Sequence, residues 1–176
     1  MRVRDMTEAD IDSVSTLRVR GWQFAYAGLI PQPVLDALSP EEDAARRREH
    51  LAEDGSPPVP SLIIEDGGET IGWASWGPYR TDESPSSNGD AELYALYVRP
   101  DRIGTGAGRA LMTAVLDAAT ASGAPRILLW VLRDNARARR FYEVAGFTTD
   151  GEEAGFEIDG TTVPEVRYVR TLARHP

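Results

Sequence analysis

The sequence contains no cysteine and no lysine, and it has only two histidines in 176 residues. Without cysteine there is no disulfide framework, no thiol nucleophile and no thiolate zinc cluster. His50 and His175 lie far apart in the chain, so a histidine metal site or a Ser-His-Asp triad is poorly supported, and we expect no metal. A P-loop needs a lysine at the end of its phosphate-binding turn, and the lack of lysine excludes one.

Long hydrophobic runs are absent as well. No stretch approaches the roughly 18 consecutive apolar residues of a membrane span, and Met1–Asp10 is charged, unlike the start of a signal peptide. We therefore expect a cytoplasmic protein without a membrane partner. The net charge of −9 argues against a nucleic-acid partner, which would need a basic surface. With 176 residues, 41% of them hydrophobic, the chain is predicted to form a single domain over residues 1–176.

The basic residues are unevenly distributed along the chain. Residues 99–140 contain eight arginines and three acidic residues, although the whole chain has a net charge of −9. A basic segment in an acidic protein indicates an anionic ligand held at one place, with solvated helix faces as the alternative explanation. The acidity of the remaining chain favours a cationic substrate, which it would attract through electrostatic steering.

Hydrophobic periodicity and turn signals predict a mixed α/β chain. Ser39 followed by Pro40 and two glutamates is typical of a helix N-terminus, and the apolar run RILLWVL at 126–132 is typical of a strand covered on both faces. The expected strands cover residues 1–5, 61–66, 70–79, 91–98, 126–132, 147–158 and 162–172, and the expected helices begin near residues 7, 39, 108 and 135. The resulting order βααβββαβαββ predicts an α/β (α+β) fold with one mixed sheet.

Residues 98–108, VRPDRIGTGAG, form a glycine-rich turn between a predicted strand and a predicted helix. Because its three glycines lack side chains, backbone N–H groups can approach a ligand, and the positive end of the helix dipole faces the same point. The turn therefore predicts an anion site, most naturally for a pyrophosphate. A dinucleotide-binding G-x-G-x-x-G motif is excluded, because Arg109 or Leu111 stands where its third glycine would be.

Two segments carry a family resemblance. AELYALYVRPDRIGTGAGRALM at residues 91–112 and LWVLRDNARARRFYEVAGF at residues 129–147 resemble the core of the GNAT superfamily of N-acetyltransferases. The resemblance implies the GNAT fold, with helices on both faces of the sheet and a coenzyme-binding core at 91–147. It also implies an acyltransferase that uses acetyl-CoA as co-substrate and forms no covalent enzyme intermediate. Ile103 stands where the family has Gln or Arg, so we expect weaker or rearranged phosphate contacts there.

The same resemblance implies roles for individual residues. Glu92 lies in an otherwise apolar or aromatic run and matches the catalytic glutamate of the family, which makes it the candidate general base, with a water relay as the alternative. Tyr142 is the candidate acid at the coenzyme sulfur, and Asn135 is expected to contact the pantetheine arm. The expected coenzyme-binding residues are Leu96, Tyr97, Val98, Ile103, Gly104, Thr105, Gly106, Ala107, Gly108, Arg109 and Asn135.

The acceptor is predicted to be a primary amine of a small molecule or of a peptide N-terminus. An alkyl amine has a pKa near 10.4, so it arrives protonated at neutral pH and needs a base. Aromatic side chains are expected to wall the acceptor site, although each could be a core residue instead. They are Trp22, Tyr26, Trp76 and Tyr79. A non-catalytic acyl-CoA sensor with the same fold is the alternative function, a nucleotide-binding protein is a second one, and a homodimer is left open.

Overall fold

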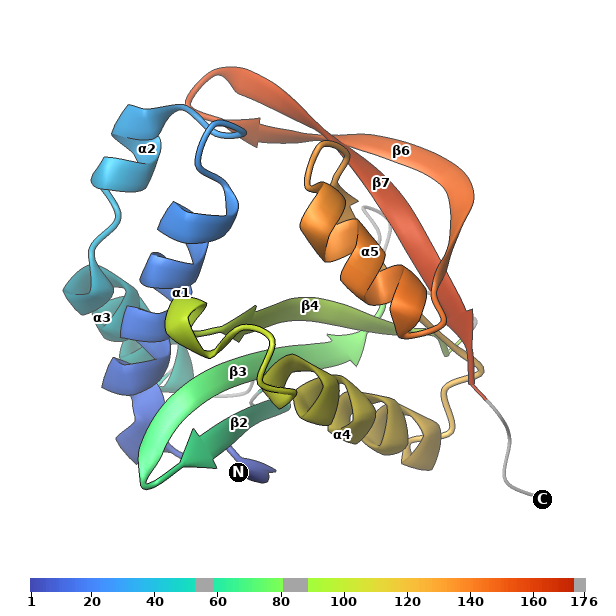
Figure 1. Ribbon diagram of the computed structural model, residues 1–176, viewed down its shortest axis with the longest axis horizontal. Coiled ribbons are helices and arrows are strands. Elements are labelled where there is room, and N and C mark those ends of the chain that lie inside the picture. The colour runs from blue at the N-terminus through green and yellow to red at the C-terminus, as the bar shows by residue number, and fades with distance from the viewer. Residues whose placement is uncertain (53–58, 81–88, 173–176) are drawn as a thin grey trace. The chain divides into compact units, whose positions relative to one another are not determined.

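The computed structural model describes residues 1–52, 59–80 and 89–172 (Figure 1). The strands are β1 Arg2–Asp5, β2 Ser61–Asp66, β3 Glu69–Pro78, β4 Ala91–Val98, β5 Arg126–Leu132, β6 Thr148–Ile158 and β7 Thr161–Thr171. The α-helices are α1 Ile11–Ala25, α2 Gln32–Asp36, α3 Pro40–Ala52, α4 Ala107–Ala121 and α5 Ala136–Val144, and two short 3-10 turns are η1 Glu8–Asp10 and η2 Pro100–Arg102.

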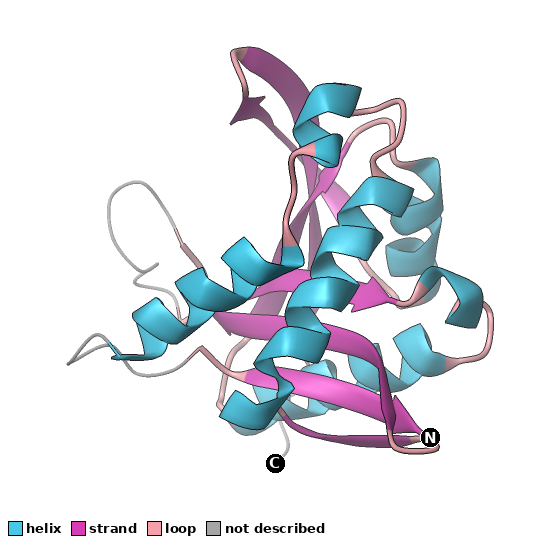
Figure 2. Ribbon diagram, turned by 90° about the vertical axis from the view of Figure 1, so that its left-hand side faces the viewer, coloured by secondary structure: helices cyan, strands magenta, loops and turns pink. Residues whose placement is uncertain are grey.

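Within the described residues, seven strands form one sheet in the order β1-β2-β3-β4-β5-β7-β6; the strands are magenta in Figure 2. Strands β4 and β5 run parallel, because helix α4 carries the chain back between them. The neighbouring pairs β1–β2, β2–β3, β5–β7 and β6–β7 are antiparallel. The predicted α/β fold with one mixed sheet is therefore confirmed.

The chain folds into two compact units. The first contains Met1–Ser75 and Ala95–Met112, and the second contains Trp76–Tyr94 and Thr113–Pro176. Strands β3 and β4 and helix α4 each contribute residues to both units. The single domain expected from chain length stays a prediction.

In the first unit, helices lie on both faces of the sheet. Trp73 of β3 is buried with Val14 and Leu17 of α1, and α1 in turn packs beside α3 (Figure 1). The preceding residue, Gly72, points to the opposite face because successive strand residues alternate. On that face a Cβ atom at Gly72 would lie 2.9 Å from Cδ1 of Leu111 in α4. Glycine therefore allows β3 and the start of α4 to approach closely.

A buried carboxylate joins the first strand to the first helix. Asp10 accepts a hydrogen bond from the Thr7 backbone N–H at 2.8 Å and two from the Arg4 guanidinium, both at 2.8 Å. Arg4 also donates to Glu65 of β2. These bonds, those from Arg4 first among them, hold the pKa of Asp10 well below its usual range. The network ties β1, β2 and the start of α1 together.

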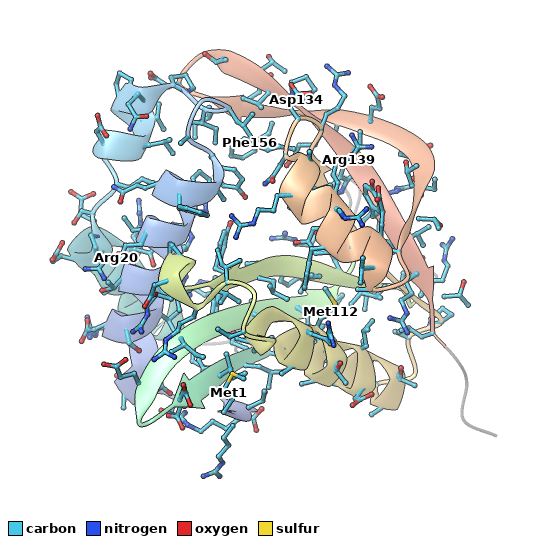
Figure 3. All side chains as sticks on the ribbon, in the orientation of Figure 1. Met1, Arg20, Met112, Asp134, Arg139 and Phe156 are labelled. Carbon is cyan, nitrogen blue, oxygen red and sulfur yellow. The ribbon has the colours of Figure 1, made fainter. Side chains whose placement is uncertain are left out.

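In the second unit, helix α5 covers one face of the β5–β7 pair. Tyr168 of β7 is 1% exposed, and its hydroxyl accepts a hydrogen bond from Arg139 Nε at 3.1 Å and donates one to Glu143 Oε1 at 2.8 Å. Figure 3 labels Arg139 on α5, together with Asp134 in the turn before this helix. Side chains two apart on β7 share a face, so residues 165 and 167 lie on the face away from α5.

The predicted elements agree with the structure except in detail. Strand β5 has the predicted bounds, and α3 begins at Pro40, directly after the predicted cap. The helix expected from residue 7 is the 3-10 turn η1 followed by α1, and α5 begins one residue later than expected because Asn135 is its N-cap. Helix α2 was not predicted, because five residues that include a proline are too few to show a helical period. None of the helices in the described ranges is long and apolar enough to cross a membrane.

Candidate functional site

The turn between β4 and α4 has an unusual backbone conformation at two glycines. Gly104 has a φ of 85° and Gly106 a φ of 94°, a region that residues with a side chain rarely adopt. No atom lies within 4 Å of the point where a Cβ would stand on either residue. The glycines are therefore required by the backbone, and the space beside them is open to a ligand.

Helix α4 begins directly after these glycines. Its first intrahelical hydrogen bond runs from the Ala110 N–H to the Gly106 carbonyl at 3.0 Å. The N–H groups of Ala107, Gly108 and Arg109 precede that bond, so they lie at the helix end that lacks intrahelical acceptors. Together with the helix dipole they form a favourable position for an anion.

The arginines near this turn differ in what they contact. Arg99 pairs with Glu69 and Asp101, and Arg102 pairs with Asp66. Among the residues that the structure describes, Arg109 has no hydrogen-bond or ion-pair partner. Its guanidinium, in the first turn of α4, is therefore an uncommitted positive charge at the loop.

Ile103 stands where a Gln or Arg was expected, and its side chain is 40% exposed. Arg102, one place earlier, is turned to Asp66 at 3.2 Å. It therefore does not replace the missing side chain in this conformation.

Tyr97 on β4 is held by aromatic neighbours in the first unit. Its ring stacks on Trp73 with centroids 6.2 Å apart, and its hydroxyl lies 3.2 Å from the hydroxyl of Tyr26. Tyr26 also packs edge-on against Trp22 at 5.0 Å. The predicted acceptor residues Trp22 and Tyr26 thus form one aromatic group with the predicted coenzyme residue Tyr97.

Strand β4 leaves its neighbour β5 early. The pairing of the two strands covers Ala91 with Ile127 and Glu92 with Leu128, and within the described chain it goes no further. Strand β4 nevertheless continues to Val98, past Leu96. Leu96 and Val98 therefore lie in the part of β4 beyond this described pairing, and their pantetheine contacts stay a prediction.

Glu92 is 6% exposed, and its carboxylate is already engaged. It accepts hydrogen bonds from the Arg80 backbone N–H at 3.0 Å, from Arg80 Nη2 at 3.0 Å and from Arg80 Nε at 3.4 Å. The Arg80 guanidinium also lies over the Tyr94 ring, 3.8 Å from its centroid, and burial raises the pKa of the Tyr94 hydroxyl. Both oxygens of Glu92 therefore already accept hydrogen bonds from Arg80.

Tyr142 on α5 is half-buried between two aromatic rings. Its ring centroid lies 5.4 Å from that of Phe141 and 6.0 Å from that of Phe147. Asn135 lies at the start of the same helix, where its Oδ1 accepts a hydrogen bond from the Ala138 N–H at 3.1 Å. The side-chain oxygen therefore caps α5, and the amide nitrogen is the group that Asn135 can offer to the coenzyme.

Tyr79 and Trp76, the other two predicted acceptor residues, belong to the second unit. The Tyr79 hydroxyl accepts a hydrogen bond from Arg167 Nη1 at 2.9 Å. Arg167 also donates to Asp150 at 2.8 Å and lies 5.6 Å from the centroid of the Trp130 ring. Trp76 is half-buried in β3.

The comparisons with known proteins identify the family. Residues 22–147 match the model of the acetyltransferase (GNAT) family. This chain belongs to the GNAT family. The uncharacterized N-acetyltransferase YuaI of Bacillus subtilis is 28% identical to it over 93% of this chain and 89% of its own length.

Solved structures share the fold of this GNAT protein. A ribosomal-protein-alanine N-acetyltransferase from Brucella melitensis superimposes with a TM-score of 0.74 at 22% identity, covering 98% of this chain and all of its own. The yncA protein of Salmonella typhimurium, solved with its cofactor acetyl-CoA, has a TM-score of 0.71 at 22% identity and covers 100% of this chain and 96% of its own. The GNAT fold and acyltransferase class predicted from the sequence are confirmed.

The sequence of this GNAT protein did not point to one candidate site residue, Glu165. Glu165 lies half-buried on β7, opposite Leu132 of β5 on one side and Ala154 of β6 on the other. A charged residue in an alternating strand sequence such as TTVPEVRYVRT is a weak signal by itself. Its importance depends on β7 lying between two strands, which the topology alone decides.

Proposed function

We propose that this protein transfers the acetyl group of acetyl-CoA directly to a primary amine of a small molecule or a peptide N-terminus. Family membership supports acetyl transfer. The observation that carries the coenzyme assignment is the β4–α4 turn, where two glycines with positive φ open onto the N-terminus of a 15-residue helix. This arrangement suits the pyrophosphate of the coenzyme, and acetyl-CoA is bound by the yncA protein of the same fold.

Arg109 adds a cation to this arrangement, because its guanidinium has no partner among the described residues. The phosphates of the coenzyme would then be neutralised by Arg109 and by the helix N-terminus. The Ile103 position would contribute no charge, so the backbone and Arg109 supply the contacts that a Gln or Arg supplies elsewhere in the family.

In the reaction the amine nitrogen attacks the thioester carbonyl and forms the new C–N bond. The C–S bond then breaks, and the sulfur receives its proton from the Tyr142 hydroxyl, which is replenished from solvent. The ring of Tyr142 is fixed by Phe141 and Phe147, so the hydroxyl is held on a rigid support. The ammonium group must lose a proton to a base before attack, and Glu92 or a water relay was the expectation for that step.

The test is a thiol-release assay with acetyl-CoA across n-butylamine, spermidine, glucosamine and an alanine-initiated peptide. We expect release above the amine-free rate with at least one of them. Ligand binding is measured separately by thermal unfolding with acetyl-CoA, ATP and NAD, and only acetyl-CoA should raise Tm. An equal shift with ATP would remove the coenzyme assignment, whereas binding without release on any amine would favour the acyl-CoA sensor.

A further inference from the structure

Glu165 is a half-buried carboxylate in β7, a strand that lies between β5 and β6. Its neighbours across the sheet are Leu132 and Ala154, which offer no side-chain donor. Within residues 1–52, 59–80 and 89–172, no hydrogen bond or ion pair reaches its oxygens. A half-buried carboxylate without a donor is costly for folding, because the charge loses water and gains nothing in exchange. Ionisable side chains in such perturbed environments concentrate at functional sites.

The strand register places Glu165 on the same face as Glu92. Glu92 lies beside Leu128 of β5, and Glu165 lies beside Leu132, four residues further along that strand. Residues an even number apart on a strand share a face, so both carboxylates project to one side. Tyr168 contacts α5, and Glu165 lies three residues before it on β7. Because side chains alternate along a strand, Glu165 projects to the face opposite α5.

Among the residues that the structure describes, the charged groups around Glu165 form no ion pair with it. On β4, Glu92 is held by Arg80. On β7 itself, Arg167 shares the face but donates to Asp150 of β6 and to Tyr79. On β6, Glu153 lies next to Ala154 and pairs with Arg133, which follows β5. Strand β5 contributes the uncharged side chains Leu128, Trp130 and Leu132. Burial first, and the negative charge of Glu92 second, raise the pKa of Glu165 above its usual range.

We propose that Glu165 is the carboxylate that binds the incoming ammonium group and accepts its proton; this inference rests on the proposed acetyl transfer. The ammonium gives one proton to Glu165, and the freed lone pair forms the C–N bond. The nitrogen loses its second proton to solvent, and Glu165 returns the first one to solvent before the next turnover. Because the sulfur takes up one proton through Tyr142, two protons are released and one is consumed, a net release of one per turnover. Glu92, held by Arg80, supplies a fixed negative charge on the same face. The acceptor class that fits is a primary ammonium, because an unneutralised carboxylate there attracts a cation and disfavours an anionic acceptor.

The experiment compares Glu165→Gln with Glu92→Gln in the full chain. Glu152→Gln is the matched control, since that residue is exposed on β6. With the most active amine of the panel, we expect Glu165→Gln to lower kcat/KM by roughly 10²–10⁴-fold at pH 7 and to leave the Kd for acetyl-CoA within about twofold. The rise of kcat/KM with pH that accompanies ionisation of Glu165 should disappear. Activity should recover in part toward pH 10, where the amine loses its own proton.

A stability measurement separates this role from a structural one. Because the pKa of Glu165 is raised in the folded state, its ionised form opposes folding, and the penalty is complete above the folded pKa. Glu165→Gln should therefore raise Tm at pH 8, and the gain should vanish as the pH falls below the usual glutamate value. A structural glutamate would instead give a lower Tm and an unchanged pH–rate profile, which would overturn the proposal.

Two further outcomes distinguish the proposals from each other. One outcome is that the wild type is active and that Glu165→Gln keeps its rate and pH profile while Glu92→Gln loses both. That result would identify Glu92 as the base. A wild type that binds acetyl-CoA but releases no thiol with any amine would count against the proposed function itself, and against Glu165 with it.

Discussion

Substituting Gly106 by valine tests the β4–α4 turn. The φ of 94° at this residue is a conformation that valine adopts only under strain, yet no atom lies within 4 Å of the new Cβ position. The variant should therefore fold with a moderate loss of stability, and its side chain should occupy the space that a pyrophosphate needs. Binding of acetyl-CoA should be lost to a far greater degree than folding.

The magnitudes separate these two effects. A strained φ costs of order 1–3 kcal/mol, which lowers Tm by roughly 2–12 °C for a chain of this size. Acetyl-CoA at 100 times its Kd should stabilise the wild type by about 2.7 kcal/mol, raising Tm by roughly 5–11 °C. If the substitution weakens binding about 100-fold, the same ligand concentration contributes only about 0.4 kcal/mol. The ligand-induced shift should then fall to roughly 1 °C.

Gly151→Val is the matched control for strain. Gly151 has a φ of 89° and an equally open Cβ position, but it lies on β6, outside the turn. Both variants should lose similar stability without ligand, as measured by thermal unfolding, and only Gly151→Val should keep the full shift with acetyl-CoA. If Gly106→Val keeps the wild-type shift, the turn does not bind the coenzyme phosphates.

Three other substitutions test separate parts of the molecule. Tyr142→Phe should lower kcat by roughly 10²–10⁴-fold with little change in the calorimetric Kd for acetyl-CoA; a lower Tm with an intact kcat would make the residue purely structural. Asp10→Asn should cost about 1.5–3 kcal/mol at pH 7 in urea unfolding, because the Arg4 bonds lose their anion. The folded pKa of Asp10 is lowered, so its stabilisation is present above the usual aspartate pKa and lost as the pH falls toward the folded value, and a difference that stays constant into acid would contradict this. Gly72→Ala should cost about 1–3 kcal/mol by overpacking against Leu111, and a variant as stable as wild type would refute the close contact.

Much of the fold could be predicted because its signals are local. The helix over residues 40–52 has a serine cap and a proline at its first position, and the strand over 126–132 is a continuous apolar run bounded by turn residues. Helix α2 escaped prediction because its five residues are placed by the surrounding packing more than by their own pattern.

The candidate site was predicted only in part. The turn that contains Gly104 and Gly106 was found because backbone freedom and closeness to a helix start are encoded within a few residues. Glu92 was selected by its position in an apolar strand, but its contact with Arg80 spans 12 residues and could not be inferred from that strand. Glu165 was not among the predicted residues, because its cross-strand neighbours Leu132 and Ala154 are set by strand register and not by the local sequence.

The sequence by itself predicted the class of site from a glycine turn before a helix, and the family resemblance added the asparagine and tyrosine of the following helix. The turn acts through local backbone conformation, which neighbouring residues control. The tertiary structure decided which charges are compensated. Strand register places Glu92 and Glu165 on one face of the sheet. Glu92 pairs with Arg80, whereas Glu165 has no hydrogen-bond donor among the described residues. The charge on a carboxylate depends on burial and on groups far away in sequence, so only the folded chain could separate the two glutamates.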